Sequence, residues 1–319
     1  MSVSSVLAID QGTTGTTCLV IGQDGRILGR AYSEFTQYFP QPGWVEHDAL
    51  EIWNTTVRVA RAAIDQASGA DICAVGITNQ RETVVLWDRE TLEPVHRAIV
   101  WQDRRTSDLC RQLKNLGHEN EVRARTGLVL DPYFSGTKIQ WILDRDPDLR
   151  SRAESGELAV GTVDSWLLAR LTNGAVHATD PTNASRTLLF HLTEGVWDPW
   201  LLDLLGVPRN LLPEVLPSSS NFGIASGVHL GIEAPITGVA GDQQAALFGQ
   251  GCWSPGLAKN TYGTGAFLLL NTGEKAVPST RGLLTTAACN KKGGLAYALE
   301  GSVFIAGAAI QWLRDGLGL

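Results

Sequence analysis

The sequence has no concentrated positive charge and no long apolar run. Asp and Glu outnumber Lys and Arg by 33 to 26, which gives a formal net charge of -7. Such a chain offers no electrostatic attraction to a phosphate backbone or an anionic bilayer, so neither nucleic acid nor membrane is expected as a partner. No apolar run reaches the roughly 18 residues of a spanning helix, and the first residues form no basic leader. These absences predict a cytoplasmic protein.

Cysteine is scarce, and several familiar motifs are missing. The chain has five cysteines, and no two of them form a CxxC pair. This odd number at wide spacing indicates reduced thiols instead of a disulfide framework or a zinc site. No GxxxxGK[ST] run occurs, and no GxGxxG follows the first strand, so a Walker-type nucleotide site and a dinucleotide fold are not supported.

Apolar segments typical of strands and helices are mixed along the chain. With 319 residues and 44% hydrophobic composition, the length allows about two domains. Strands at 6–10, 18–22 and 26–32, with an Asp-Gly turn at Asp24, predict an antiparallel meander. A helix should follow from Asp48, whose side chain can cap it while Glu51 reaches back. The mixture indicates an α/β fold.

Further elements are expected along the rest of the chain. We expect strands at 72–77, 83–87 and 235–240, and helices at 107–116, 136–145, 162–171 and 243–249. A domain boundary is placed near Phe248, which divides the chain into 1–248 and 249–319. In the second part, strands at 258–262 and 266–271 flank a turn, and a strand at 295–299 leads to a helix at 303–314.

Polar side chains follow three of the predicted strands directly. Asp10 ends the first strand, Arg81 and Glu82 follow the strand at 72–77, and Asp242 follows the strand at 235–240. Polar groups at several strand ends predict one composite site.

The turn after Asp10 has the composition of a phosphate cradle. Gly12 would let the backbone approach oxygen atoms, and the hydroxyls of Thr13 and Thr14 would donate to phosphate. The Asp10 carboxylate could hold Mg²⁺ directly or through its waters. The alternative is an ordinary β-turn in which Asp10 accepts local hydrogen bonds.

The segment around Arg81 predicts a site for a small polyol. A polyol presents hydroxyls on its edges and carbon on its faces, so it needs paired donors and acceptors beside an aromatic wall. Arg81 with Glu82 would supply the polar groups, and Trp101 with Tyr133 the wall. The alternatives are a solvated ion pair for Arg81 and Glu82, and core packing for the two aromatic residues.

Asp242 stands where a catalytic base is needed. A carboxylate at the start of a helix could accept the proton of a hydroxyl nucleophile, as kinases require. Taken alone, an Asp in this position is more often a helix cap. Its occurrence with the other two strand ends favours the functional interpretation.

Taken together, these segments resemble the FGGY carbohydrate kinases, which have the actin and Hsp70-like ATPase fold. The resemblance runs from Val6 to Leu319 and includes the run 42–48, the run 259–265, and Lys138 and Trp141 at the spacing of a family signature. It implies a ribonuclease H-like amino-terminal domain followed by the beginning of a second domain of the same type. ATP and polyol would meet between the two domains.

The resemblance also assigns roles to individual positions. It implies glycerol as the substrate, with ATP and Mg²⁺ as cofactors and ADP and glycerol 3-phosphate as products. Asp242 would be the general base. The substrate-binding residues would be Arg81, Glu82, Trp101, Tyr133, Asp242, Gln243 and Phe267. The residues toward ATP and Mg²⁺ would be Asp10, Thr13, Thr14, Gly15, Thr264, Gly307 and Gln311.

The chain departs from the family pattern at several points. Thr17 stands where relatives often carry an Arg, and Glu233 stands where relatives inhibited by fructose 1,6-bisphosphate carry an Arg, so no such inhibition is expected. The family's second domain normally continues past Leu319. The apolar face of the helix at 303–314 would therefore lack its partners, which predicts association between copies. A kinase for another sugar or polyol, and a non-catalytic remnant, stay open as alternatives.

Overall fold

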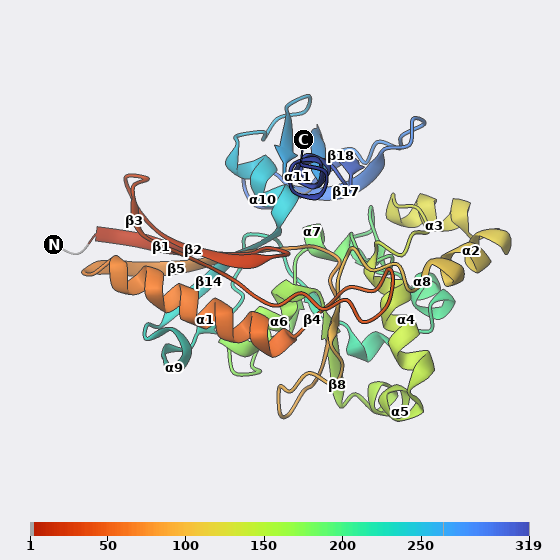
Figure 1. The fold of residues 1–319 in the computed structure, drawn as a ribbon, viewed down its shortest axis with the longest axis horizontal. Coiled ribbons are helices and arrows are strands. Elements are labelled where there is room, and N and C mark those ends of the chain that lie inside the picture. Colours follow the sequence, from red (N-terminus) through yellow and green to blue (C-terminus); the bar gives the residue numbers. More distant parts are fainter. Residues whose placement is uncertain (1–2, 264, 319) are drawn as a thin grey trace.

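The computed structural model describes residues 3–263 and 265–318, and its strands and helices form the expected α/β arrangement (Figure 1). The larger sheet has the strand order β13-β14-β5-β1-β2-β3. Its strands are β1 (Val3–Gln11), β2 (Gly15–Gly22), β3 (Ile27–Glu34), β5 (Ala70–Asn79), β13 (Ile224–Ala225) and β14 (Ala234–Gly241). The predicted meander is confirmed, because β1, β2 and β3 pair antiparallel in chain order. Strands β1, β5 and β14 are parallel to one another.

Helix α1 (Ala49–Gln66) lies along one face of this sheet, and the carboxy-terminal part of the chain lies on the other side (Figure 1). Buried Ile52, Val59 and Ala63 of α1 pack with strand residues such as Leu7 and Val20. Asp48 caps the helix as predicted, because its side chain accepts from the amides of Leu50 and Glu51. The predicted return contact from Glu51 is wrong, since this carboxylate instead accepts from the amide and hydroxyl of Thr36.

A second group of elements, with its own apolar core, lies beside the larger sheet (Figure 1). Helices α6 (Val163–Leu171) and α9 (Gly227–Leu230) pack in the core of the larger sheet. The helices of the second group are α2 (Ser107–Asn115), α3 (Glu119–Thr126), α4 (Ser135–Arg145), α5 (Pro147–Ser155), α7 (Pro181–Ala184) and α8 (Pro199–Leu204), with a 3-10 turn at Arg209–Leu211. Its short strands are β4 (Glu46–His47), β6 (Val85–Asp88), β7 (Ala98–Ile99), β8 (Leu158–Gly161), β9 (Ala178–Thr179), β10 (Phe190–His191), β11 (Val196–Trp197) and β12 (Glu214–Val215).

The strand predicted at 83–87 begins two residues later than expected. Glu82 has a left-handed backbone with φ of 62°, and the amide of Thr83 donates to the carbonyl of Arg81. This tight turn delays regular pairing, so β6 starts at Val85. The displacement places Arg81 and Glu82 in a turn at the end of β5.

Helix α10 (Asp242–Gly249) leads from the larger sheet to a second, antiparallel sheet with the order β15-β16-β18-β17. Its strands are β15 (Ala258–Tyr262), β16 (Ala266–Gly273), β17 (Leu284–Cys289) and β18 (Leu295–Val303). The helix predicted from 303 starts later, as α11 (Gly307–Gly316), because Val303 pairs with Ala266 and still belongs to β18. Among the residues that the structure describes, no helix is long and apolar enough to cross a membrane.

Candidate functional site

The three predicted strand ends do meet at one edge of the larger sheet. In the parallel register Gln11 faces Asn79, and Asn79 faces Gly241, so the residues that follow these positions are brought together. A cavity of about 420 Å³ opens there. Its lining includes most of the predicted polyol and phosphate residues, namely Thr13, Thr14, Arg81, Glu82, Trp101, Tyr133, Asp242, Gln243 and Phe267.

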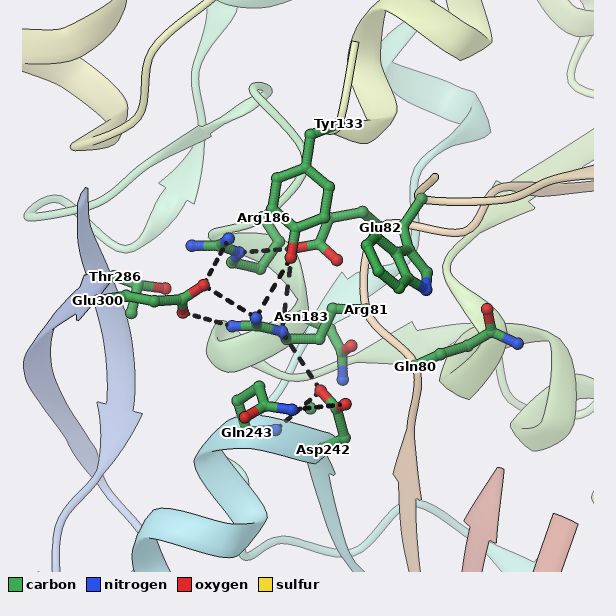
Figure 2. A network of polar contacts seen from close by, with 12 residues as sticks. Gln80, Arg81, Glu82, Tyr133, Asn183, Arg186, Asp242, Gln243, Thr286 and Glu300 are labelled. Carbon is green, nitrogen blue, oxygen red and sulfur yellow. Dashed lines mark hydrogen bonds and ion pairs between the residues drawn. The ribbon is translucent and has the colours of Figure 1, made fainter. Parts of the chain in front are cut away.

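Arg81 and Glu82 are buried, so the interpretation as a solvated ion pair is wrong. Their residues are 2% and 1% exposed. The Arg81 Nε lies 3.8 Å from the Glu82 carboxylate, while its two terminal nitrogens donate to Glu300 at 2.7 and 3.0 Å. Glu82 in turn accepts from Arg186 Nε at 2.7 Å. Figure 2 shows these groups converging between the two sheets.

The left-handed backbone of Glu82 is part of how this pair is arranged. An L-residue other than glycine rarely adopts this conformation, and such strain collects at functional sites where the surroundings enforce it. Here Ser135 Oγ donates to the Glu82 carbonyl at 3.0 Å, and Arg186 holds the carboxylate. Burial raises the pKa of Glu82, and the guanidiniums of Arg81 and Arg186 oppose that rise.

Gly241 makes room for the Arg81 side chain where β14 meets α10. A Cβ placed on Gly241 would lie 2.7 Å from both Cγ and Cδ of Arg81. Its backbone amide donates to Thr182 Oγ1 at 2.8 Å, which fixes the strand end. A glycine is therefore needed here for close approach, although its φ of -60° suits any residue.

Asp242 is the first residue of α10, and Gly241 is the N-cap, so the alternative of Asp242 as the cap is wrong. The Asp242 carboxylate accepts from the amide and the side-chain nitrogen of Gln243 at 2.8 and 2.9 Å. It lies 3.4 Å from Arg81 Nε, and 37% of the Asp242 side-chain surface is exposed. The carboxylate thus faces the cavity and can still accept a proton from a bound hydroxyl.

Aromatic rings line one side of the cavity. The Trp101 ring lies 5.7 Å from Tyr133 and 6.2 Å from Phe267, both in edge geometry. Phe304, which was not predicted from the sequence, packs behind these lining residues with its ring 5.1 Å from that of Tyr133. Tyr133 is also part of an apolar core, and Trp101 packs against that core. Core packing and cavity lining therefore coincide in these two side chains.

The turn between β1 and β2 is held by side chains from several elements. Gly12 donates to the Gly15 carbonyl at 2.9 Å, and Gln37 donates to the Thr13 carbonyl at 3.0 Å. His47 lies behind Gln37, with its Nε2 2.7 Å from the Gln37 side-chain oxygen. Burial lowers the pKa of His47 to about 4, so this imidazole is neutral. Thr13 is half-buried and Thr14 is exposed at the cavity.

Asp10 lines a neighbouring hollow of about 540 Å³, beside Thr17, Lys291 and Lys292. Asp10 is an exposed residue, yet the surrounding protein raises the pKa of its carboxyl to about 6, and the charge of Asp242 adds to that rise. Two carboxylates that repel each other at a strand end favour a bound cation between them. In the part of the chain that the structure describes, no group of three or more His, Cys, Asp or Glu is arranged around a metal position.

The second sheet contributes the other side of the cavity. Gly263 and Gly265 line it, and the amide of Gly307, at the start of α11, donates to the Gly263 carbonyl at 2.9 Å. The predicted phosphate contacts from Thr264 and the Gln311 side chain lie outside the described residues.

Several residues of the site were not singled out from the sequence. Arg186 and Glu300 carry the buried ion pairs, and Lys259 donates to the Gln243 side chain and to Thr261. Burial lowers the pKa of Lys259 to about 8, and the nearby Arg81 charge adds to this effect. The available signal was a lone acid, Glu300, directly after the apolar run 295–299.

The sequence is similar to that of one family of known proteins over most of its length. Residues 5–249 match the amino-terminal domain of the FGGY family of carbohydrate kinases. The chain is 58% identical over 316 residues to a glycerol kinase of Alcanivorax borkumensis and 60% identical over 319 residues to one of Trichlorobacter lovleyi. These alignments cover 98% and 99% of the chain but 63% and 64% of the relatives, so the chain spans less than two thirds of their length.

Solved structures agree with the sequence comparisons. The fold matches a crystal structure of Plasmodium falciparum glycerol kinase with ADP at a TM-score of 0.93 and 38% identity, over 100% of this chain and 64% of that one. A xylulose kinase of Rhodospirillum rubrum matches at a TM-score of 0.88 and 22% identity, over 98% of this chain and 63% of that one, which shows a shared fold alone. The predicted actin-like α/β fold class is thereby confirmed.

Proposed function

Because the chain belongs to the FGGY family of carbohydrate kinases, we propose that it serves the ATP-dependent phosphorylation of glycerol. The relatives named glycerol kinase support this substrate. The observation that carries the proposal is the single cavity in which Arg81, Glu82 and Asp242 face an aromatic wall. The chain spans only part of its relatives, so both polyol binding and phosphoryl transfer need a test.

The lining of the cavity suits a small polyol. Arg81 and Gln243 supply donors, while Glu82 and Asp242 supply acceptors, and both kinds of partner are needed for a chain of hydroxyl groups. Trp101 and Phe267 cover the carbon face. Their rings would limit the length of a bound polyol, which favours glycerol over pentoses and hexoses.

In the proposed reaction, a terminal hydroxyl of glycerol attacks the γ-phosphorus of ATP. The new O–P bond forms as the bond to the ADP oxygen breaks, and the hydroxyl proton passes to the Asp242 carboxylate. Asp242 suits this role because it stays partly exposed to the cavity. Closure of the two sheets around the substrates would exclude water as a competing nucleophile.

The phosphates of ATP would be bound by Thr13, Thr14 and the amide of Gly15 on one side and by Thr264, Gly307 and Gln311 on the other. Asp10 and Asp242 could hold Mg²⁺, because carboxylate oxygens are its preferred ligands; burial raises the Asp10 pKa, and the Asp242 charge adds to that rise. Bound there, Mg²⁺ would neutralise charge on the phosphates during transfer.

A cytoplasmic location is part of the proposal. The five cysteines are all free, which suits a reducing compartment.

The proposal is tested by measuring ADP release from ATP and Mg²⁺ with glycerol, xylulose and gluconate. We expect a higher kcat/KM for glycerol than for the other two. Cys73→Ser is the control for the effect of a substitution outside the site, because this exposed residue does not line the cavity, and its kcat/KM values should match those of the unaltered chain. A preference for xylulose or gluconate would overturn the substrate, and glycerol binding without ADP release would restrict the function of this chain to binding.

A further inference from the structure

We propose that Glu300 is a positioning residue that holds the two terminal nitrogens of Arg81, so that only Nε reaches Asp242, and thereby keeps the polyol site open. This inference rests on the proposed function, because Arg81 and Asp242 are its polyol-binding residues. Glu300 itself does not line the cavity. Its action reaches the substrate through the Arg81 guanidinium.

Three carboxylates surround that guanidinium, and Glu82, at 3.8 Å from Nε, is the most distant of them. Glu300 accepts from both terminal nitrogens of Arg81, at 2.7 and 3.0 Å, whereas the nearest Asp242 oxygen lies 3.4 Å from Nε. A carboxylate that engages two nitrogens of the fork fixes the plane as well as the position of the group. Glu300 therefore determines where Arg81 points (Figure 2).

The burial of Glu300 makes this contact specific. Glu300 is 0% exposed, as is Arg186, whose terminal nitrogen donates to Glu300 at 3.0 Å. Burial opposes its ionisation, but the guanidiniums of Arg186 and Arg81 lower the pKa of Glu300 to about 2. Ser302 Oγ adds a further hydrogen bond at 3.1 Å. Glu300 thus stays charged throughout the physiological range.

Charge balance explains why these groups tolerate burial. Arg81 and Arg186 bring two positive charges, and Glu82 and Glu300 bring two negative charges, so the buried group is neutral overall. Removing one member leaves an uncompensated buried charge, which is stabilised if its side chain moves toward the nearest remaining group of opposite charge. For Arg81 without Glu300, the nearest partners are Asp242 and Glu82.

The position of Glu300 in the fold is suited to this task. It lies in β18 between two neighbouring strands, paired with Leu269 of β16 and with Leu284 of β17. Arg81 and Arg186 come from the larger sheet and from the segment after α7. Glu300, on a central strand of the second sheet, therefore fixes the orientation of Arg81, which follows a strand of the larger sheet.

Substituting Glu300 by Gln tests this role. The amide has nearly the same shape, but its NH₂ group would face a guanidinium donor and carries no charge. We expect the terminal nitrogens of Arg81 to turn toward Asp242 and the glycerol Kd of the chain, measured by calorimetry, to rise about tenfold or more. A Kd within about twofold of the unaltered chain would overturn the proposal.

Thr286→Val is the matched control. Thr286 lies at the same contact between the sheets, where it bonds Ser185 and Gln244 without touching Arg81. We expect this variant to unfold at a lower temperature while its glycerol Kd stays within about twofold. If both variants weaken glycerol binding equally, Glu300 acts only through general stability and the proposal fails.

Glu300→Asp covers the case in which the Gln variant does not fold. It keeps the negative charge but shortens the side chain by one methylene, so it cannot reach both terminal nitrogens. We expect a folded chain with a glycerol Kd raised by about threefold or more, and an unchanged Kd would contradict the proposal.

A crystal structure of the Gln or Asp variant separates this inference from the proposed function. If the unaltered chain binds no glycerol, the proposed function fails, and the direction of Arg81 still decides the role of Glu300. In the unaltered chain only Nε of Arg81 contacts Asp242, and in the variant we expect a terminal nitrogen of Arg81 to contact Asp242 as well. An Arg81 side chain in its original position would overturn the inference.

Discussion

The Trp101 indole nitrogen donates to the Thr13 hydroxyl at 2.8 Å, which joins the aromatic wall of the cavity to the proposed phosphate turn. Because the Thr13 oxygen accepts from the indole, its own proton is free to donate to a phosphate oxygen. The two halves of the site are thus connected by one hydrogen bond.

Trp101→Phe should separate the two roles of this side chain. Phenylalanine keeps an aromatic wall but removes the donor to Thr13. We expect the glycerol Kd to change by less than about threefold and the turnover number to fall by about three- to tenfold, the effect of one lost hydrogen bond. Calorimetry and steady-state kinetics measure the two quantities, and equal losses in both would show that the hydrogen bond has no separate role.

Asp242→Asn should abolish the proposed base while preserving the shape of the site. The amide still accepts from Gln243 through its oxygen, so glycerol binding should persist, while turnover should fall by about 10²-fold or more. Kinetics with both substrates at saturation provide the test. A variant that keeps most of its turnover would show that Asp242 serves only to bind substrate.

Gly241→Ala should disturb Arg81 through direct contact. The added methyl group would lie 2.7 Å from the Arg81 side chain, so either the strand end or Arg81 must move. We expect a loss of about 1–3 kcal/mol in stability and weaker glycerol binding. Gly249→Ala, in the same helix region with nothing within 4 Å of the added atom, is the matched control and should behave like the unaltered chain.

The pH dependence of stability should report the raised pKa of Asp10. A carboxyl group whose pKa is raised from 3.8 to about 6 on folding makes the folded chain less stable as pH rises between these two values, and the cost is complete above 6. Asp10→Asn removes the cost. Its unfolding midpoint should exceed that of the unaltered chain at pH 8 and approach it at about pH 3, where Asp10 is largely protonated in both the folded and the unfolded chain.

The difference in unfolding midpoint should be small, because Asp10 is exposed to solvent. Thermal unfolding followed by circular dichroism at the two pH values measures it. The same difference between the two proteins at both pH values would contradict the assignment to Asp10.

The strand ends of the larger sheet were predictable because local sequence determines them. An apolar strand followed by Asp10, Arg81 or Asp242 is visible in one window of residues, and parallel pairing brings such ends together. The cap at Asp48 was equally local. These features depend on residues a few positions apart.

The buried ion pairs could not be predicted in this way. Arg81 and Glu300 are 219 positions apart, and a charged residue in a strand does not reveal its partner. The start of α11 was misjudged because Val303 fits the apolar face expected for that helix, whereas this β-branched residue pairs with Ala266 in β18. Glu51 bonds Thr36 because the preceding loop reaches it, which no helix pattern indicates.

The most direct test of the account is a calorimetric titration of glycerol into the purified chain. All polyol-binding residues that we propose lie within the chain, so we predict saturable heat with one site per chain. Arg81→Ala should abolish that heat, and xylulose should bind more weakly than glycerol. The absence of a saturable signal for glycerol, or tighter binding of xylulose, would contradict the proposal that this cavity is a glycerol site.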